Sequence, residues 1–565
     1  MGQAAFGVAQ QVVRASELRE EAHVLAERAR RAAALLQGRA LLGSEALALL
    51  EAAGAAVPAG AAAPWSAATP ALQLAALLGR LRLGGAVAPE PQPRLLRWLR
   101  RLGARPRPRL RCQRCGSGTA RMRRTACAAC GSACAYCEAC LTMGRSRECG
   151  LLILGMPSSG AAGAQPVPAS PATSARTAPP ATSAPPAPSA STASSVTTAS
   201  PAPSAATPAP SWGLSPAQSA ATTAALNFMA AGPANSKAPR KFLLWAVTGA
   251  GKTEMIFPLI EACLKHGGKA LIATPRRDVV LELDPRIRRA FPANAVVTLY
   301  RGSEQRWEQG EITLATTHQL FRFHQGFDLV IIDEIDAFPY HNDAMLHYAA
   351  DKVCKPGSVN ILLSATPPAE LRRAATLGRL AHVRVPVRFH RHPLPVPVQR
   401  QIPSVRKMLD KRILPGELLK SLRRSLNRGA QLFVFVQQIR DVEPLVERLR
   451  RAFPETTIDG TSSKDPDRSN KVTRFRDRSI RMLVTTTILE RGVTIPMSDV
   501  FILDADGKLF DDASLIQMAG RAGRSKDDPA GAVYFFGSAR THSQHSAIRQ
   551  IKSMNRIARR KGYLC

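Results

Sequence analysis

The sequence predicts an α/β protein with two parallel-sheet domains in tandem, preceded by a small cysteine-rich module and an Ala/Arg-rich helical N-terminal region. Three observations lead to this prediction. From residue 213 onward, short apolar runs alternate with helix-like segments; eight of the 11 cysteines lie between Cys112 and Cys149; and a Pro/Ala/Ser/Thr-rich stretch separates the two patterns. Strands that alternate with helices form parallel sheets that are covered on both faces.

Composition and charge narrow the class of protein. Lys and Arg number 77 against 42 for Asp and Glu, a net charge of +35, which favours nucleic acid as a partner before a membrane surface. A compositional bias toward arginine is the alternative, because no lysine precedes Lys237. No apolar run reaches the ~18 residues of a membrane helix, and no secretory leader is evident, so we expect a cytoplasmic protein without membrane insertion.

The chain divides by composition into five predicted parts. They are a helical region at 1–108, a cysteine-rich module at 109–150, a disordered linker at 157–212, a first α/β domain at 213–395 and a second at 405–565. The linker carries a single charge, Arg176, and is too poor in apolar residues to offset chain entropy. The predicted strands are the apolar runs at 242–247, 269–274, 311–317, 328–336, 359–366, 431–436, 482–487, 500–506 and 531–536.

The string AVTGAGKT at 246–253 follows a predicted strand and precedes a predicted helix, which is the setting of a phosphate-binding loop. Gly249 and Gly251 let backbone N–H groups approach phosphates, and the helix N-terminus adds partial positive charge. Lys252 would neutralise the β/γ-phosphates of ATP, and the Thr253 hydroxyl would hold Mg2+.

Further motifs complete a nucleotide site. Asp333 and Glu334 end an apolar strand, where a carboxylate can hold Mg2+ and its neighbour can orient the attacking water. Arg521 and Arg524 lie three residues apart, and either could stabilise charge on a transferred γ-phosphate. Ser364 and Thr366, in SATPP, follow another strand.

In this order the motifs resemble those of superfamily 2 helicases and translocases, which have two RecA-like domains. More narrowly, the phrases LLWAVTGAGKTEMIFPLI, IATPRRDVVLEL, TTHQL, VIIDEIDAFPY, LLSATPP, TTTILERGVTIP and QMAGRAGRS resemble the late competence ATPases of the ComFA family. The resemblance covers about 213–560. It implies a cytoplasmic ATPase, free or peripheral at the inner face of the membrane, which supports uptake of single-stranded DNA with a membrane channel and other competence proteins.

The resemblance also implies roles for single residues. ATP contacts would come from Lys252, Thr253, Asp333, Glu334, Arg521 and Arg524, with Gln517 at the start of the arginine motif and Gln218 reading adenine. Ser364 and Thr366 would couple the ATP site to DNA. DNA-facing loops would include Thr274, Pro275, Arg276, Thr316, Thr317, His318, Thr486 and Thr487; for His318 a structural role is an equal alternative.

Two pairs of cysteines, Cys112-x2-Cys115 and Cys127-x2-Cys130, are each followed by glycine and predict chelating turns. With Cys134, Cys137, Cys140 and Cys149 they make eight thiols, the number that two four-thiolate zinc sites require. Spacing alone would pair the two turns with each other. The resemblance implies instead one site of Cys112, Cys115, Cys137 and Cys140, which leaves Cys127, Cys130, Cys134 and Cys149 for a second zinc ion. We favour the second pairing; an iron–sulfur motif lacks its fourth ligand and proline.

Nine arginines lie between Arg94 and Arg114, with Trp98 among them. Arginine follows phosphates and an indole stacks on an unpaired base, so this segment predicts a DNA contact, with a solvated face as the alternative. Together the motifs predict a motor that hydrolyses ATP on single-stranded DNA. The alternatives are a helicase of the primosome-restart type and a nucleotide-gated adaptor that binds DNA without productive hydrolysis.

Overall fold

The structure is a computed structural model that describes residues 2–55, 64–90, 109–157, 212–232, 238–486, 495–526 and 528–565, with side chains from residue 19 onward. Three expectations fall outside these residues: nearly all of the linker at 157–212, Thr487, and the part of the arginine-rich segment that contains Trp98. None of the helices in the described ranges is long and apolar enough to cross a membrane.

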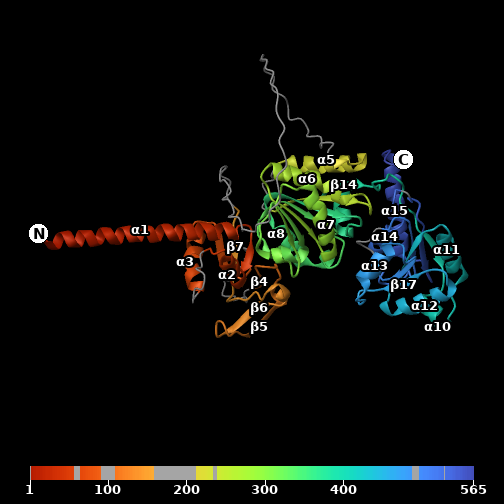
Figure 1. The fold of residues 1–565 in the computed structure, drawn as a ribbon, viewed down its shortest axis with the longest axis horizontal. Helices are drawn as coiled ribbons and strands as arrows, with labels where there is room; N and C mark the ends of the chain where they lie inside the picture. Colours follow the sequence, from red (N-terminus) through yellow and green to blue (C-terminus); the bar gives the residue numbers. More distant parts are fainter. Residues whose placement is uncertain are drawn as a thin grey trace, which may run out of the picture. The chain divides into compact units, whose positions relative to one another are not determined.

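In the described part of the N-terminal region, three helices accompany a three-stranded antiparallel sheet (Figure 1). The helices are α1 (Gly2–Leu36), α2 (Gly43–Ala52) and α3 (Pro64–Leu77), and the strands, in sheet order, are β1 (Ala40–Leu42), β7 (Leu151–Gly155) and β2 (Leu81–Gly85). The helices were predicted, but the sheet was not, because strands this short in an Ala/Leu/Gly-rich segment show no distinctive alternation. Since β7 follows the cysteines, the cysteine-rich module is an insertion between two strands of this sheet.

The cysteine-rich module consists of two small antiparallel pairs. Strand β3 (Val87–Pro89) pairs with β4 (Leu110–Cys112), and β5 (Met122–Ala126) forms a hairpin with β6 (Ala133–Cys137). An isolated bridge joins Tyr136 to Arg147, so the chain returns beside β6 before it enters β7.

The first α/β domain contains a seven-stranded parallel sheet in the order β10-β11-β9-β12-β13-β8-β14. In that order the strands are Val296–Leu299, Ile312–Thr316, Ala270–Thr274, Phe327–Ile332, Cys354–Ser364, Arg240–Ala246 and Ala381–Val385. Its helices are α5 (Pro216–Ala230), α6 (Lys252–Lys265), α7 (Arg277–Ala290), α8 (Ala344–Lys352) and α9 (Ala369–Thr376). The interior strands are almost wholly buried, as expected for a sheet covered on both faces.

The second α/β domain contains a six-stranded parallel sheet in the order β15-β20-β19-β16-β18-β17. These strands are Val398–Gln401, Val533–Gly537, Ser498–Ile502, Gln431–Phe435, Met482–Thr485 and Ile458–Thr461. Its helices are α10 (Val405–Asp410), α11 (Gly416–Asn427), α12 (Val442–Ala452), α13 (Arg468–Arg476), α14 (Asp512–Ala519) and α15 (His542–Arg560). Short 3-10 helices are η1 (Thr119–Arg121), η2 (Leu141–Met143), η4 (Glu304–Trp307), η5 (Thr317–Arg322), η6 (Tyr340–Asn342) and η7 (Ile439–Asp441).

Two parallel-sheet domains in tandem confirm the predicted fold class. The nine predicted strands are the nine interior strands of the two sheets, and the four that were missed, β10, β14, β15 and β17, are the four edges. Parallel strands end at one edge of their sheet, so the loops after β8, β9, β11, β12 and β13 meet there. These loops carry the motifs of the first domain.

Candidate nucleotide and metal sites

The predicted phosphate loop lies between β8 and α6. Gly249 and Gly251 have φ of 79° and 73°, the left-handed conformation that glycine adopts without strain. Lys252 begins α6, so the first N–H groups of the helix face the loop. The Nζ of Lys252 lies 3.3 Å from Oδ1 of Asp333. The phosphate loop and the acidic motif are therefore adjacent. A nucleotide phosphate on the loop and a Mg2+ ion on the acidic motif would need this proximity, because the ion binds to the phosphates.

Gln218, the predicted adenine reader, is held by hydrogen bonds to the start of its own helix and to the phosphate loop. Its Oε1 accepts a hydrogen bond from the Ser215 N–H (2.8 Å), which caps α5, and its Nε2 donates to the Ala250 carbonyl in the phosphate loop (2.9 Å). The side chain is 5% exposed. In this structure Gln218 therefore stabilises the phosphate loop through a hydrogen bond to its backbone. Adenine recognition by Gln218 stays a prediction.

The acidic motif begins where β12 ends. The Asp333 N–H donates to the Ala273 carbonyl of β9, and the Glu334 N–H donates to the Asp333 Oδ1 at 2.8 Å. Glu334 has φ 54°, a left-handed conformation that costs a non-glycine residue on the order of 1 kcal/mol. A residue held in such a conformation beside the phosphate loop suits the role predicted for it, the orientation of a water molecule.

The last residue of the motif, Asp336, connects the two α/β domains. Its carboxylate accepts hydrogen bonds from the hydroxyls of Ser364 (2.6 Å) and Thr366 (2.7 Å). Gln517, from α14 of the second domain, donates to Asp336 Oδ2 (3.3 Å) and to Thr366 Oγ1 (3.2 Å). We expected Gln517 among the nucleotide contacts; the structure places it on Asp336 and on Thr366, one of the two predicted coupling residues.

The two motif arginines follow α14. Arg521 is 2% exposed, and its backbone carbonyl accepts a hydrogen bond from Ser498 Oγ. Arg524 donates from Nε to the Gly520 carbonyl (2.8 Å). Burial lowers the pKa of Arg524 to about 10, and the nearby carboxylates of Glu282 and Glu334 oppose this shift. Arg524 is therefore cationic at neutral pH and close enough to Glu334 to interact with it through charge.

Arg388 is a site residue that the sequence did not predict. It lies between the two domains, is 1% exposed, and donates hydrogen bonds to the carbonyls of Gly520, Ala522 and Gly523 in the arginine motif. A Cβ at Gly249 would lie 3.5 Å from Cγ and Cδ of Arg388, so the aliphatic part of the same side chain lies against the phosphate loop. Burial and the charge of Arg524 lower the pKa of Arg388 to about 9. The only sequence signal was its place in a Pro-rich connection.

The predicted DNA contacts are mostly buried. Thr274, Thr317 and Thr486 are 1%, 0% and 7% exposed, and the hydroxyls of Thr274 and Thr317 have no hydrogen-bond partner among the described residues. Arg276, at the N-terminus of α7, is partly exposed. For His318, burial lowers the pKa while Asp343 opposes the shift. Of this set only Arg276 presents an accessible cation.

The eight clustered cysteines form two groups of four. The first group consists of four buried residues, Cys112, Cys115, Cys137 and Cys140. The second group consists of Cys127, Cys130, Cys134 and Cys149. Within each group, the sulfur atoms lie within 4.8 Å of one another. The pairing of the two turns with each other, which spacing alone indicated, is not what the structure brings together. In the first group, Cys112 and Cys140 are 3.8 Å apart and Cys115 and Cys137 are 3.6 Å apart, too far for disulfides. Four thiols so placed fit tetrahedral zinc.

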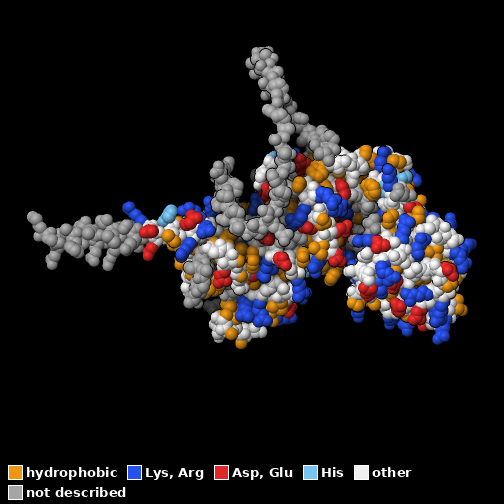
Figure 2. Space-filling view, in the orientation of Figure 1, with side chains coloured by type: hydrophobic (Ala, Val, Ile, Leu, Met, Phe, Trp, Pro, Cys, Tyr) orange, Lys and Arg blue, Asp and Glu red, His pale blue; other side chains and the backbone are white. Residues whose placement is uncertain are grey.

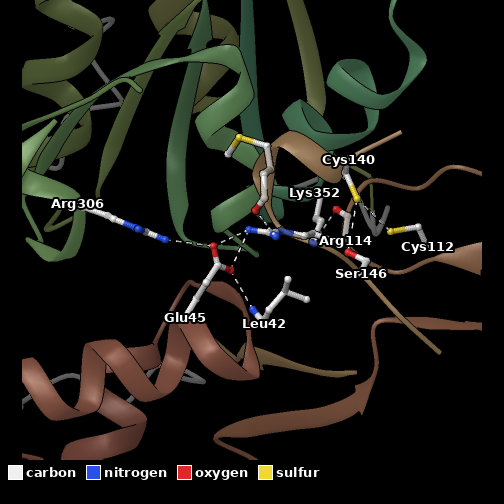
Figure 3. A network of polar contacts seen from close by, with 9 residues as sticks. Leu42, Glu45, Cys112, Arg114, Cys140, Ser146, Arg306 and Lys352 are labelled. Atoms are coloured by element: carbon white, nitrogen blue, oxygen red, sulfur yellow. Dashed lines mark hydrogen bonds and ion pairs between the residues drawn. The ribbon is translucent and has the colours of Figure 1, made fainter. Parts of the chain in front are cut away.

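A buried ion pair fixes the first group to its surroundings (Figure 3). Arg114, between Cys112 and Cys115, is fully buried and pairs with Glu45 of α2 at 2.9 Å. Glu45 also contacts Arg306 of the first α/β domain at 3.4 Å. From the same domain, Lys352 donates to the carbonyls of Gln113 and Arg114. The turn therefore joins the N-terminal region to the first α/β domain.

Three protein-family models match the chain. They are the competence protein ComFA N-terminal domain at 101–154, the type III restriction enzyme res subunit at 212–369, and the helicase conserved C-terminal domain at 414–526. The competence protein ComFA of Bacillus subtilis is 41% identical over 318 residues, which cover 56% of this chain and 68% of that protein. Its namesake in Streptococcus pneumoniae is 40% identical over 316 residues, 56% of this chain and 73% of that protein.

The chain belongs to the ComFA family. Among solved structures, S. cerevisiae Dbp5 bound to RNA and ADP BeF3 is similar, with 15% identity, a TM-score of 0.42, and coverage of 62% of this chain and 94% of that one. This member of the ComFA family is an ATP-hydrolysing, helicase-like enzyme with a role in competence and in DNA binding. Both cysteine groups lie within the match to the family's N-terminal model.

Proposed function

We propose that this protein is an ATP-driven translocase on single-stranded DNA that supports DNA uptake in competence. The observation that carries the proposal is the connection through Asp336. It lies three residues after Asp333 of the nucleotide site, binds Ser364 and Thr366 of the first domain, and accepts a hydrogen bond from Gln517 of the second. A change at the nucleotide can thus reach the contact between the two domains.

Each site residue has a role in hydrolysis that follows from its chemistry. Lys252 would bind the β/γ-phosphates; its present partner, Asp333, would then be released from that ion pair. Glu334 would hold the attacking water and accept its proton, and Arg521 and Arg524 would stabilise the charge that develops on the phosphoryl group. Asp333 and the Thr253 hydroxyl are oxygen donors of the kind Mg2+ prefers, and the ion would supply further charge neutralisation there.

Movement requires that the two domains alternate their hold on DNA. Arg276 offers a phosphate contact at the end of β9, where the first domain's loops meet. The buried hydroxyls of Thr274 and Thr317 would become donors to phosphates if their loops shift outward. Contacts of this kind act on the backbone and carry little sequence information, which suits a protein that moves along any sequence. The net charge of +35 favours the same polyanion.

Zn2+ bound by Cys112, Cys115, Cys137 and Cys140 would have a structural role, because four thiolates leave no open coordination position. The cysteine-rich module, the arginine-rich segment before it and the linker all precede the two α/β domains in the sequence. We further propose that they serve contacts with DNA, with the membrane channel and with other competence proteins at the inner face of the membrane.

The test is ATP turnover by the purified full-length protein with no DNA, with single-stranded DNA and with duplex of the same length. We expect single strands to stimulate turnover most, and Lys252→Ala to abolish it. Arg276→Ala should raise the DNA concentration for half-maximal stimulation without changing turnover at saturation. Equal stimulation by duplex and single strands, or none by either, would contradict the proposed substrate.

A further inference from the structure

The structure assigns a second metal site to Cys127, Cys130, Cys134 and Cys149, and we propose that it binds Zn2+ independently of the first and holds the β5–β6 hairpin closed. The four residues converge from the turn of the hairpin, from β6 and from the segment before β7. The proposal does not depend on the proposed motor activity.

The distances between the sulfurs fit one tetrahedral ion. All four lie within 4.8 Å of one another, and Cys127 and Cys149 are 3.7 Å apart. Zinc–sulfur bonds of about 2.3 Å place the sulfurs of a tetrahedron about 3.8 Å apart. A disulfide needs sulfurs about 2.05 Å apart, so the cysteines are not arranged as two cross-links.

The turn that carries Cys127 and Cys130 repeats the turn of the first site in its backbone. In the first, the Gly116 N–H donates to the Cys112 carbonyl (2.9 Å) and the Cys112 N–H donates to the Ser117 carbonyl (2.9 Å). In the second, the Gly131 N–H donates to the Cys127 carbonyl (2.8 Å) and the Cys127 N–H donates to the Ser132 carbonyl (3.1 Å).

The glycines of the two turns show that this shape is not a result of packing. Gly116 and Gly131 have φ of 78° and 67°. At Gly116 a side chain would also meet the ring of Tyr348, at 2.6 Å, whereas a side chain at Gly131 would meet nothing within 4 Å. No neighbour requires a glycine at 131, so the left-handed turn itself does, and that turn directs two sulfurs toward one point.

The outer strand and the turn of the hairpin have little else to hold them, whereas β6 contributes Ala135 and Cys137 to a hydrophobic core cluster. In β5, every residue after Met122 is exposed. Within the described residues, the first four cysteines belong to a hydrophobic core cluster but these four do not. Arg123 and Arg124 make ion pairs with Glu138 and Glu148, but both arginine side chains are more than half exposed and such pairs contribute little. Figure 2 shows Lys and Arg side chains gathered over this hairpin.

A two-stranded hairpin in which only one strand packs on a hydrophobic core is marginal at its turn, so a metal ion is the stabilising element that the chemistry of the turn provides. The guanidinium of Arg147 supports this assignment, because its Nη1 donates to Cys127 Sγ at 3.3 Å. Four thiolates around one divalent ion leave two negative charges, which a cation at this position offsets. Four sulfur ligands select zinc, with iron as the competing ion.

The test is the metal content of the full-length protein, measured by elemental analysis after chelator-free purification. We expect two zinc ions per chain, with eight of the 11 thiols protected from a thiol reagent until the metal is extracted. This measurement on the unmodified protein does not depend on the folding of any variant. One ion per chain with four of these eight thiols reactive would overturn the proposal, as would iron with its visible absorbance.

A pair of variants places the ion. Cys127→Ser/Cys130→Ser should retain one zinc and increase deuterium exchange over 122–137, while Cys565→Ser, which changes an isolated exposed thiol, should retain two and exchange as the unmodified protein does. If the double variant keeps the full metal content, the site is elsewhere and the proposal is wrong. If it loses both ions although its circular dichroism and ATP turnover are unchanged, the two sites are not independent and that part of the proposal fails.

Discussion

Removing the guanidinium of Arg388 should slow ATP hydrolysis without weakening ATP binding. Its N–H groups are donors to three buried carbonyls of the loop that carries Arg521 and Arg524. In Arg388→Met these acceptors lose their donors, at a cost of about 1 kcal/mol or more each. If about 3 kcal/mol of that cost falls on the conformation that presents the arginines, kcat falls about 100-fold. Arg388→Lys keeps one charge but not the fork, and should recover part of the rate.

The assay is steady-state ATP turnover at saturating single-stranded DNA. Because Arg388 acts on the backbone of the arginine loop, we expect kcat to fall while KM for ATP changes less than about threefold, a threshold well below the 100-fold loss. The matched control is Arg400→Met, which removes a half-exposed arginine from β15, the edge strand that follows the interdomain connection. A kcat for Arg388→Met within twofold of the unmodified protein would refute the reasoning, and an equal rise in KM would show that Arg388 acts on nucleotide binding.

Two further predictions concern stability. Burial, with the charges of Lys352 and Arg82, lowers the pKa of His324 to about 4. As the pH falls, His324 therefore takes up its proton in the unfolded chain before it does so in the folded protein. The free energy of unfolding should drop by up to about 3 kcal/mol between pH 6.5 and pH 4. Urea unfolding across this range should show a shallower slope for His324→Gln; an unchanged slope would exclude His324 as the source. Arg114→Met leaves the buried Glu45 with the more distant Arg306 as its cationic partner and should cost about 3 kcal/mol in urea unfolding. Arg30→Met, which breaks an exposed pair with Glu27, should cost less than about 1 kcal/mol. Equal losses for these two variants would show that the buried pair does not fix the cysteine-rich module.

The sequence was sufficient for the interior of both sheets and insufficient for their edges. Interior parallel strands are buried on both faces and appear as continuous apolar runs. The edge strand β15 has the sequence VQRQ and is mostly exposed, and β17 has the sequence IDGT, so neither shows such a run. The N-terminal sheet was missed because its strands are short and lie far apart in the sequence. Its central strand, β7, is separated from β2 by the whole cysteine-rich module.

Some residues of the candidate sites could likewise be predicted from the sequence, and others could not. Lys252, Asp333 and Glu334 could be predicted because strand, turn and helix place them by local sequence alone. Arg388 could not be predicted, because its role comes from contacts with Gly249 and Gly523. Each of these glycines is more than 130 residues away from Arg388 in the sequence, one before it and one after it. The position of Gln517 on Asp336 likewise depends on how the second domain meets the first. For the cysteines, spacing alone indicated the pairing of the two turns, whereas the fold brings together the pairing that the resemblance implied.

The central claim is that ATP hydrolysis drives movement along single-stranded DNA, and displacement of streptavidin from biotinylated oligonucleotides tests it most directly. We expect the unmodified protein to displace streptavidin from one end of the strand only, and only with ATP. Glu334→Gln keeps the size of the side chain but not its basic carboxylate, so it should bind ATP and DNA and displace nothing. Displacement by Glu334→Gln at the rate of the unmodified protein, or ATP turnover by the unmodified protein without displacement from either end, would contradict the account.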